Sequence, residues 1–202
     1  MRTITKAMQF IEIQAQYFNL DSKQLYSQTK SLLMLYRNVV WSVKKRANNL
    51  QNEISGTYGM QLNTALMYLS DFAPNRAKED FEITVSNLFQ SHWLIKLIDL
   101  SLKYVYDYPI YGETYANILK LRFLEEAKRN DGTVSEILSL ERSTYYDRKK
   151  EAILLLGVSL WGFVIPKALT TYKRIAYLSI SEDDFFNRVS LEQSTQRLNL
   201  ET

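Results

Sequence analysis

TVSEILSLERSTYYDRKK, residues 133–150, is the stretch that decides the fold predicted for this chain. Val134, Leu138 and Leu140 are spaced as the apolar positions that hold two short helices against each other. Ser135 is small where the two helices would cross most closely. Ser139 stands at the turn, where glycine is usually preferred because a positive φ costs it least. The pattern predicts a helix-turn-helix within residues 111–161, with a supporting helix before it and a long helix leading out of it.

The second helix of this motif is predicted to carry the functional side chains. Ser143 or Thr144 is expected to cap its first N–H groups, and Tyr145 is expected to face inward. The start of such a helix reaches the floor of the DNA major groove, where arginine can read guanine and a tyrosine ring can meet a thymine methyl. Basic residues one turn later hold phosphates. The predicted base contacts are Arg142, Ser143, Thr144 and Tyr146, and the predicted phosphate contacts are Arg148, Lys149 and Lys150.

Two segments of this region also resemble a known family. YANILKLRFLEE, residues 115–126, and TVSEILSLERSTYYDRKKEAILLLG, residues 133–157, resemble the fourth region of bacterial sigma factors. They are more similar to the sigma-like transcription regulators of phages of Gram-positive bacteria, the ArpU type of late-gene activator. The likeness covers about a quarter of the chain, and serine replaces the usual glycine at position 139. The resemblance implies a phage or mobile-element regulator of late genes that contacts RNA polymerase.

Composition predicts an all-α fold. The chain has 202 residues, of which 46% are apolar, and only six glycines and three prolines interrupt them. So few helix breakers favour long helices. The net charge is only +3, so DNA binding would depend on local basic clusters rather than on bulk charge. The absence of cysteine excludes disulfides and thiolate metal sites and fits a cytoplasmic protein.

The spacing of apolar residues predicts three regions. Residues 1–108 form a helical oligomerisation or partner-binding part, residues 109–180 form the helix-turn-helix module, and residues 181–202 form a polar C-terminal tail. The first region contains helices predicted at 3–18, 22–54, 62–69 and 78–106, with Asp21 and Ser22 capping the second. Its basic cluster at Lys44, Lys45 and Arg46 is interpreted as a solvated helix face. The self-association surface is expected on helices 22–54 and 78–106, and a homodimer is the expected assembly.

The most hydrophobic window, residues 153–169, is interpreted as a core segment rather than a membrane span. It contains Gly157, Gly162 and Pro166, and a kink or break is expected at the proline. A further helix is predicted at 167–180. Trp41, Trp93 and Trp161 are expected in the core.

No enzyme is predicted, and no cofactor. Glu125 and Glu126 are adjacent acids, but no histidine, lysine or metal-ligand pattern converges on them, so they are interpreted as surface residues. The single histidine, His92, cannot form a metal site alone. The phosphate-binding, dinucleotide, HExxH and nucleophile-elbow motifs are all missing.

Two other functions remain open beside transcription regulation. A small terminase subunit for DNA packaging also joins a helix-turn-helix to an oligomerising part, although its DNA module usually comes first in the chain. A protein-binding adaptor could retain the sigma-like module without binding DNA. In that case residues 142–150 would be a solvated basic turn on a helical core, which is the usual meaning of such a cluster.

Overall fold

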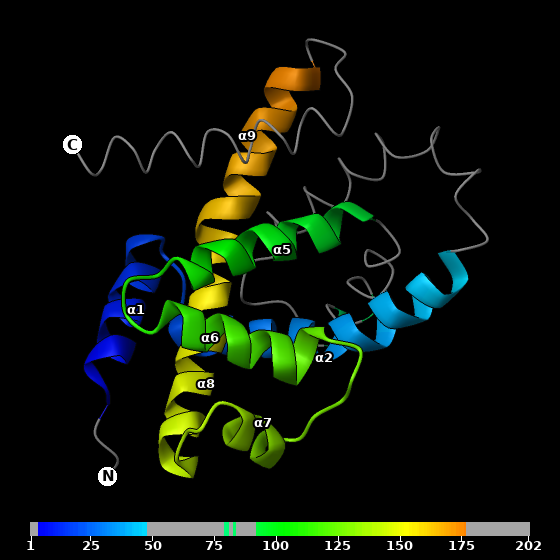
Figure 1. The fold of residues 1–202 in the computed structure, drawn as a ribbon. Helices are drawn as coiled ribbons and strands as arrows, with labels where there is room; N and C mark the ends of the chain where they lie inside the picture. The colour runs from blue at the N-terminus through cyan, green and yellow to red at the C-terminus, as the bar shows by residue number, and fades with distance from the viewer. Residues whose placement is uncertain (1–3, 48–78, 81–82, 84–91, 177–202) are drawn as a thin grey trace.

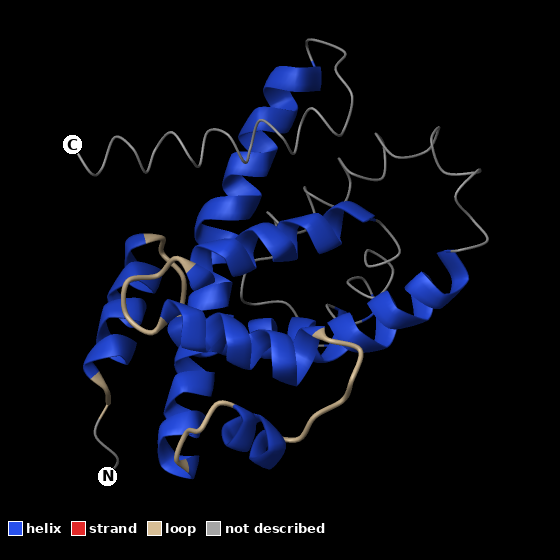
Figure 2. Ribbon diagram, viewed as in Figure 1, coloured by secondary structure: helices blue, strands red, loops and turns tan. Residues whose placement is uncertain are grey.

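The computed structural model describes residues 4–47, 79–80, 83 and 92–176, and these residues are mostly helical, joined by turns and loops, with no strand among them (Figure 2). The predicted all-α fold is therefore confirmed for this part of the chain. The predicted helix at 62–69 and the tail at 181–202 lie outside it, as do the side chains of Lys44–Arg46, Trp41, His92 and Trp93. The elements are α1 Lys6–Tyr17, α2 Ser22–Ala47, α5 His92–Tyr106, α6 Gly112–Leu119, the π-helical η1 Lys120–Leu124, α7 Asp131–Ile137, α8 Arg142–Gly157, the π-helical η2 Val158–Val164 and α9 Ile165–Ala176.

A single helical column made of α8, η2 and α9 runs through the molecule (Figure 1). Helices α2 and α6 pack against α8, and α5 packs against η2. Helix α1 packs against both α8 and η2. The short helix α7 packs beside the start of α8, at the foot of the column (Figure 1). The core around the column takes residues from every one of these helices except α7; five of them are Ile11, Leu25, Leu97, Tyr115 and Leu155. The helices before residue 108 and the helices after it therefore pack into the same main core, on both sides of the boundary predicted there.

A second, smaller core joins α7 to α6 and α8. Ile118, Val134 and Tyr145 are buried in it. Leu121, Leu138 and Leu140 pack against these three while remaining partly exposed. The predicted packing of Val134, Leu138 and Leu140 is confirmed, and so is the inward-facing Tyr145, which is 1% exposed.

The first two helices begin at side-chain caps. Thr5 accepts a hydrogen bond from the Met8 N–H and sets the start of α1. The helix predicted at 3–18 begins later than expected, at Lys6, so Ile4 precedes it and is 53% exposed. The predicted cap at Asp21 is confirmed, because its Oδ1 accepts the Gln24 N–H at 2.8 Å.

Gly157 lies where α8 crosses α2. A Cβ atom at this position would lie 2.4 Å from Thr29 Oγ1 and 2.9 Å from Leu25 Cγ. Such distances are far below van der Waals contact, so only glycine lets the two backbones approach this closely. Although glycine lowers helix propensity, tertiary packing decides its use here.

The break or kink expected at Pro166 takes the form of a π-helical segment. The helix runs on from α8 through η2 into α9, and η2 ends two residues before the proline. Proline has no N–H and its ring collides with the carbonyl of the preceding turn, so a regular α-helix would lose a hydrogen bond there. A widened turn absorbs this conflict without ending the helix. The predicted helix at 167–180 is confirmed as far as Ala176.

By length and composition the helix over Arg142–Thr171 could cross a membrane, but 67% of its most apolar window is buried inside the fold. Most of this window is therefore covered by the other helices of the protein. Trp161 packs against the main core, as predicted.

Candidate nucleic-acid interface

The turn between α7 and α8 is closed by the last residues of α7 themselves. The Ser139 N–H donates to the Glu136 carbonyl at 3.0 Å, and the Leu140 N–H donates to the Ser135 carbonyl at 2.9 Å. This is the Schellman arrangement, which places one residue in the left-handed region. That residue is Ser139, with a φ of 52°. The prediction that Ser139 occupies a position suited to glycine is confirmed.

The start of α7 is also fixed locally. Asn130 Oδ1 accepts the Thr133 N–H at 2.8 Å, so α7 begins at Asp131. Asp131 and Gly132 are the first two residues of this helix. Ser135 is half-buried, and its hydroxyl donates to the Gly132 carbonyl at 2.8 Å.

The start of α8 differs from the prediction. Neither Ser143 nor Thr144 is the capping residue, because α8 begins at Arg142 and Glu141 occupies the N-cap position without a side-chain cap bond. The Schellman turn uses residues up to Leu140, so only Glu141 separates it from the helix. Ser143 is consequently the second residue inside the first turn, beyond the position from which a hydroxyl can cap.

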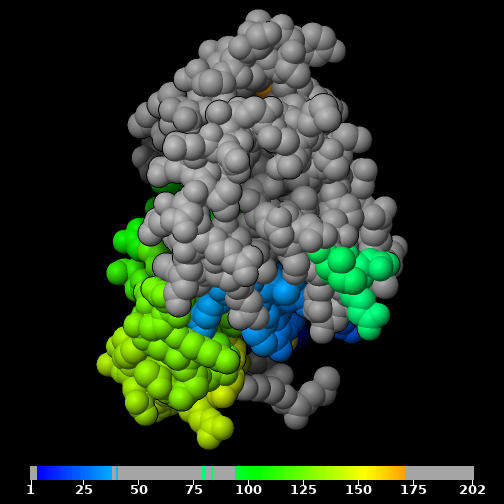
Figure 3. Space-filling model, turned by 90° about the vertical axis from the view of Figure 1, so that its right-hand side faces the viewer, coloured from blue at the N-terminus to red at the C-terminus, as the bar shows by residue number. Residues whose placement is uncertain are grey.

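One face of the first turns of α8 is exposed. Arg142, Ser143, Tyr146 and Lys150 are exposed, whereas Thr144 is half-buried. Their spacing of one and four residues places them on the same side of an α-helix. Asp147, which the sequence analysis did not single out, is half-buried on that side as well. Figure 3 shows the lobe formed around α7 as the lime and yellow-green surface at the lower left.

Two cations flank the ring of Tyr146. The Arg142 guanidinium lies 6.0 Å from the ring centroid, and the Lys149 ammonium lies 4.7 Å from it. Both distances are within the range of cation–π attraction. The ring is therefore held on the surface of the helix in a positively charged setting.

Lys149 is engaged inside the protein. Its ammonium forms an ion pair with Asp131 at 2.8 Å, and the two side chains are 16% and 23% exposed. Asp131 also accepts hydrogen bonds from Arg122 Nε at 2.9 Å and from the Tyr145 hydroxyl at 2.8 Å. Partial burial works to raise the pKa of Asp131, but the hydrogen bonds from Lys149, Tyr145 and Arg122 outweigh it and lower that pKa. This carboxylate ties the first residue of α7 to α8 and η1.

Arg148 is engaged through a buried carboxylate. It forms an ion pair with Glu151 at 2.6 Å, and the Glu151 side chain is fully buried. Glu151 also accepts hydrogen bonds from the Tyr115 hydroxyl at 2.8 Å and from the Thr5 hydroxyl. Burial and the bond to Glu151 raise the pKa of Tyr115, so its hydroxyl stays a donor. Glu151 thus links α1, α6 and α8.

The Arg148 guanidinium also lies over the Tyr111 ring, at 3.6 Å from the ring centroid. Tyr111 precedes α6 and has a φ of 62°, a left-handed conformation that is an outlier for a bulky residue. Strain of this kind persists only where surrounding contacts hold the residue in place. Arg148 is one such contact, and Tyr115, whose ring centroid is 6.2 Å away, is another.

Arg37 of α2 anchors the segment that leads into α7. Its Nε donates to the Glu125 carbonyl at 2.9 Å, and its Nη2 donates to the Arg122 carbonyl at 2.7 Å. These carbonyls lie at the end of η1, where helical partners run out. The Glu125 side chain pairs with Arg129, and Glu126 is exposed, in agreement with the predicted surface role of both acids.

The structure therefore places the seven predicted contact residues in three different settings. Arg142, Ser143, Tyr146 and Lys150 share an exposed face, Thr144 is turned partly inward, and Arg148 and Lys149 are held in ion pairs with Glu151 and Asp131. Sequence reasoning missed both acids. One signal was present for Glu151, which directly precedes the apolar run at 152–156 and lies one turn after Arg148.

No family model, no curated protein and no solved structure was found to match this chain.

Proposed function

We propose that this protein is a sequence-specific transcription regulator that reads double-stranded DNA with α7, the Ser139 turn and α8. The observation that carries the proposal is the exposed face of Arg142, Ser143, Tyr146 and Lys150 at the start of a helix whose other sides are fixed. The second helix of a helix-turn-helix enters the major groove with its first residues against the base edges. An exposed, rigidly held start of α8 meets this requirement.

The geometry supports distinct roles along α8. Arg142 is suited to guanine O6 and N7, and the Tyr146 ring is suited to a thymine methyl. Lys150, two turns farther along the same face, is suited to a phosphate. Arg148 and Lys149, which the sequence placed among the phosphate contacts, act in this proposal by holding α8 against α6 and α7.

The proposal extends to partners. A regulator of this type acts as a homodimer on a site with two half-sites, in which residues 1–108 provide the contact between copies. The resemblance to the phage late-gene activators supports a role in the bacterial cytoplasm, on late genes of a phage or mobile element, together with RNA polymerase.

The test is selection of bound sequences from random double-stranded DNA, followed by fluorescence anisotropy on the selected site. An operator with two half-sites is expected. Arg142→Ala should weaken binding to that site by roughly 1–3 kcal/mol and binding to random DNA much less, because a base contact is lost only where the right base is present. Lys103→Ala, a change on the exposed face of α5, is the matched control and should leave both affinities unchanged.

Other outcomes lead to the competing functions. Binding without sequence preference or salt dependence would refute DNA reading and favour the adaptor. A ring of eight or more subunits in sedimentation would favour DNA packaging.

A further inference from the structure

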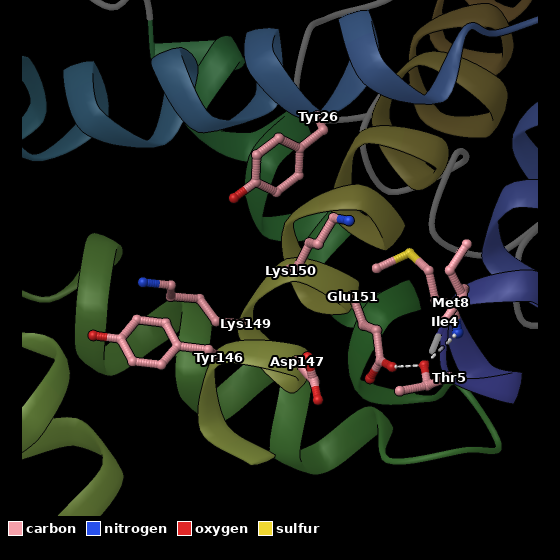
Figure 4. Close-up of a pocket in the computed structure, with 9 residues that line it drawn as sticks. All are labelled: Ile4, Thr5, Met8, Tyr26, Tyr146, Asp147, Lys149, Lys150 and Glu151. Atoms are coloured by element: carbon pink, nitrogen blue, oxygen red, sulfur yellow. Dashed lines mark hydrogen bonds between the residues drawn. The ribbon is translucent and has the colours of Figure 1, made fainter. Parts of the chain in front are cut away.

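Helix α1 has two apolar faces, and the fold buries one of them. The residues buried against the other helices are Ala7, Met8, Ile11 and Ala15. At the start of α1, Thr5 and Met8 extend toward α8, and the Thr5 hydroxyl donates to the Glu151 carboxylate (Figure 4). These contacts fix which side of α1 is turned inward. Helix α1 forms one edge of the fold (Figure 1), so its second apolar face is turned outward.

This outer face carries three large apolar side chains. Phe10, Ile13 and Tyr17 are 53%, 59% and 81% exposed. Spacings of three and four residues align them in one row along the helix, on the side opposite to Ile11 and Ala15. Single exposed apolar residues are normal on a protein surface, whereas an aligned row at this spacing is the pattern of a helix that packs against a partner.

The apolar surface continues past the end of α1. The Tyr17 ring meets the Phe18 ring edge-on, with the ring centroids 5.1 Å apart, and the Phe18 ring meets the Phe163 ring at 4.5 Å. Phe163 of η2 is 44% exposed, and Tyr104 of α5 stacks on it at 5.8 Å. The row on α1 therefore leads into an aromatic cluster that the main fold holds in place.

The order of residues along the row fits a second copy of the same helix running in the opposite direction. With Ile13 near the two-fold axis, Phe10 of each copy lies opposite Tyr17 of the other, because the two residues flank Ile13 at three and four positions. Lys6 extends the row at its start and is exposed, and Asp21 is exposed four residues past its end. An antiparallel pair brings the Lys6 end of one copy to the Asp21 end of the other, and it also opposes the two helix dipoles. Such a face is complementary to itself in shape and in charge, as a two-fold contact requires.

We propose that the outer face of α1 (Phe10, Ile13 and Tyr17, with Lys6 and Asp21 at its ends) binds a second copy of this chain as an antiparallel helix pair. The pair is the contact in the homodimer of the proposed function, on which its role in DNA binding rests. It places that contact on α1 instead of on the helices expected at 22–54 and 78–106. Helix α1 is only about 18 Å long. A contact centred on it is small beside the standard of about 800 Å² per partner, so the dissociation constant should be on the order of 10–100 µM.

Sedimentation velocity of the full chain, from about 5 µM to about 300 µM, tests the association. The wild type should pass from monomer to dimer over this range. Ile13→Glu should weaken the dimer at least about tenfold, because it replaces a central apolar contact with two carboxylates near the two-fold axis. Ser27→Glu adds the same charge at an exposed position of α2, so it is the matched control and should leave the dimer unchanged. Melting curves should show an unchanged Tm for both variants, since both side chains are exposed.

The charges at the two ends test the direction of the pair. Lys6→Glu should weaken the dimer a fewfold, because it opposes Asp21 of the other copy. Asp21→Asn in the Lys6→Glu background should recover part of the loss, since asparagine removes the charge and still caps α2. No recovery would overturn the antiparallel arrangement. A wild type that stays monomeric, an Ile13→Glu variant that dimerises like the wild type, or loss of the dimer in Ser27→Glu would overturn the contact on α1.

DNA binding separates this inference from the proposed function. On an operator with two half-sites, Ile13→Glu should bind more weakly than the wild type. On a single half-site the two proteins should bind equally, because the start of α8 is unchanged. Equal affinities on the full operator would overturn the role of the α1 pair in DNA binding. If the wild type dimerises through α1 and binds no DNA, the proposed function fails and the contact on α1 stands.

Discussion

Two neighbouring lysines of α8 should behave differently when each is changed to methionine, which keeps the length of the apolar stem. Lys149 is paired with Asp131 at 2.8 Å, and the two side chains are only 16% and 23% exposed. Exposed pairs contribute about 0.2–1 kcal/mol and hydrogen bonds to charged groups about 1.5–3 kcal/mol, so this half-buried pair should contribute about 1–2 kcal/mol. Arg122 and Tyr145 remain as donors to Asp131, which keeps the cost below that of an orphaned buried charge. Lys150 is exposed, and its replacement should leave stability unchanged.

Melting curves and anisotropy at four salt concentrations check this contrast. Lys149→Met should lower Tm by about 2–4 °C for each kcal/mol lost, and it should leave the dependence of DNA affinity on salt unchanged. Lys150→Met should leave Tm unchanged and reduce the slope of log affinity against log salt by about 0.9, because one phosphate contact is lost. If Lys149→Met flattened the salt dependence and left Tm unaltered, its ammonium would be a phosphate contact, and the positioning role argued here would be wrong.

Three further changes test the packing and the electrostatics. Ser139→Gly should stabilise the fold by about 1 kcal/mol in urea unfolding, since glycine adopts the φ of 52° without the penalty that serine pays. Gly157→Ala should destabilise it by about 1–3 kcal/mol despite alanine's higher helix propensity, because the new Cβ would lie 2.4 Å from Thr29 Oγ1; a gain in stability would contradict the close crossing. The lowered pKa of Asp131 means that its stabilisation is present at neutral pH and is lost as the pH falls below about 4, through the folded-state pKa. Asp131→Asn should therefore reduce stability at pH 7 and flatten its decline between pH 5 and pH 3, and an unchanged pH profile would exclude this carboxylate as a source of the decline.

The features that sequence reasoning predicted correctly are those that neighbouring residues determine. The turn at Ser139, the inward Tyr145 and the cap at Asp21 each follow from spacings of a few residues. The helix predicted at 22–54 is also correct where it is described, and its Leu25 and Leu32 are each 1% exposed. Helical periodicity is a local property and survives any arrangement of the helices.

The features that sequence reasoning missed depend mostly on contacts with residues in other helices or on burial in the folded protein. Lys149 had the appearance of a surface cation because Asp131, in another helix, could not be recognised as its partner without the fold. Glu151 lies one turn after Arg148 in the same helix, and what the fold adds is that its carboxylate is fully buried. Glu151 also accepts a hydrogen bond from the hydroxyl of Thr5, which lies 146 positions away in the sequence. The sequence places Gly157 in the hydrophobic window at 153–169, whereas the close crossing with α2 that requires a glycine there is seen only in the fold. The prediction of a cap at Ser143 or Thr144 was wrong for another reason. The sequence does not fix the length of the turn at Ser139, and so it does not fix the residue at which α8 begins.

The two cores have a consequence for amide hydrogen exchange. The column of α8, η2 and α9 passes from the small core of Ile118, Val134 and Tyr145 into the main core. Opening the small core releases α7 and the first turns of α8 without exposing the main core, so it costs less free energy than global unfolding. Amides at the start of α8 should then exchange through this local opening, and amides after Glu151 only through global unfolding. One helix would report two stabilities, and the difference between them measures how firmly the α7–α8 module is attached to the rest of the fold.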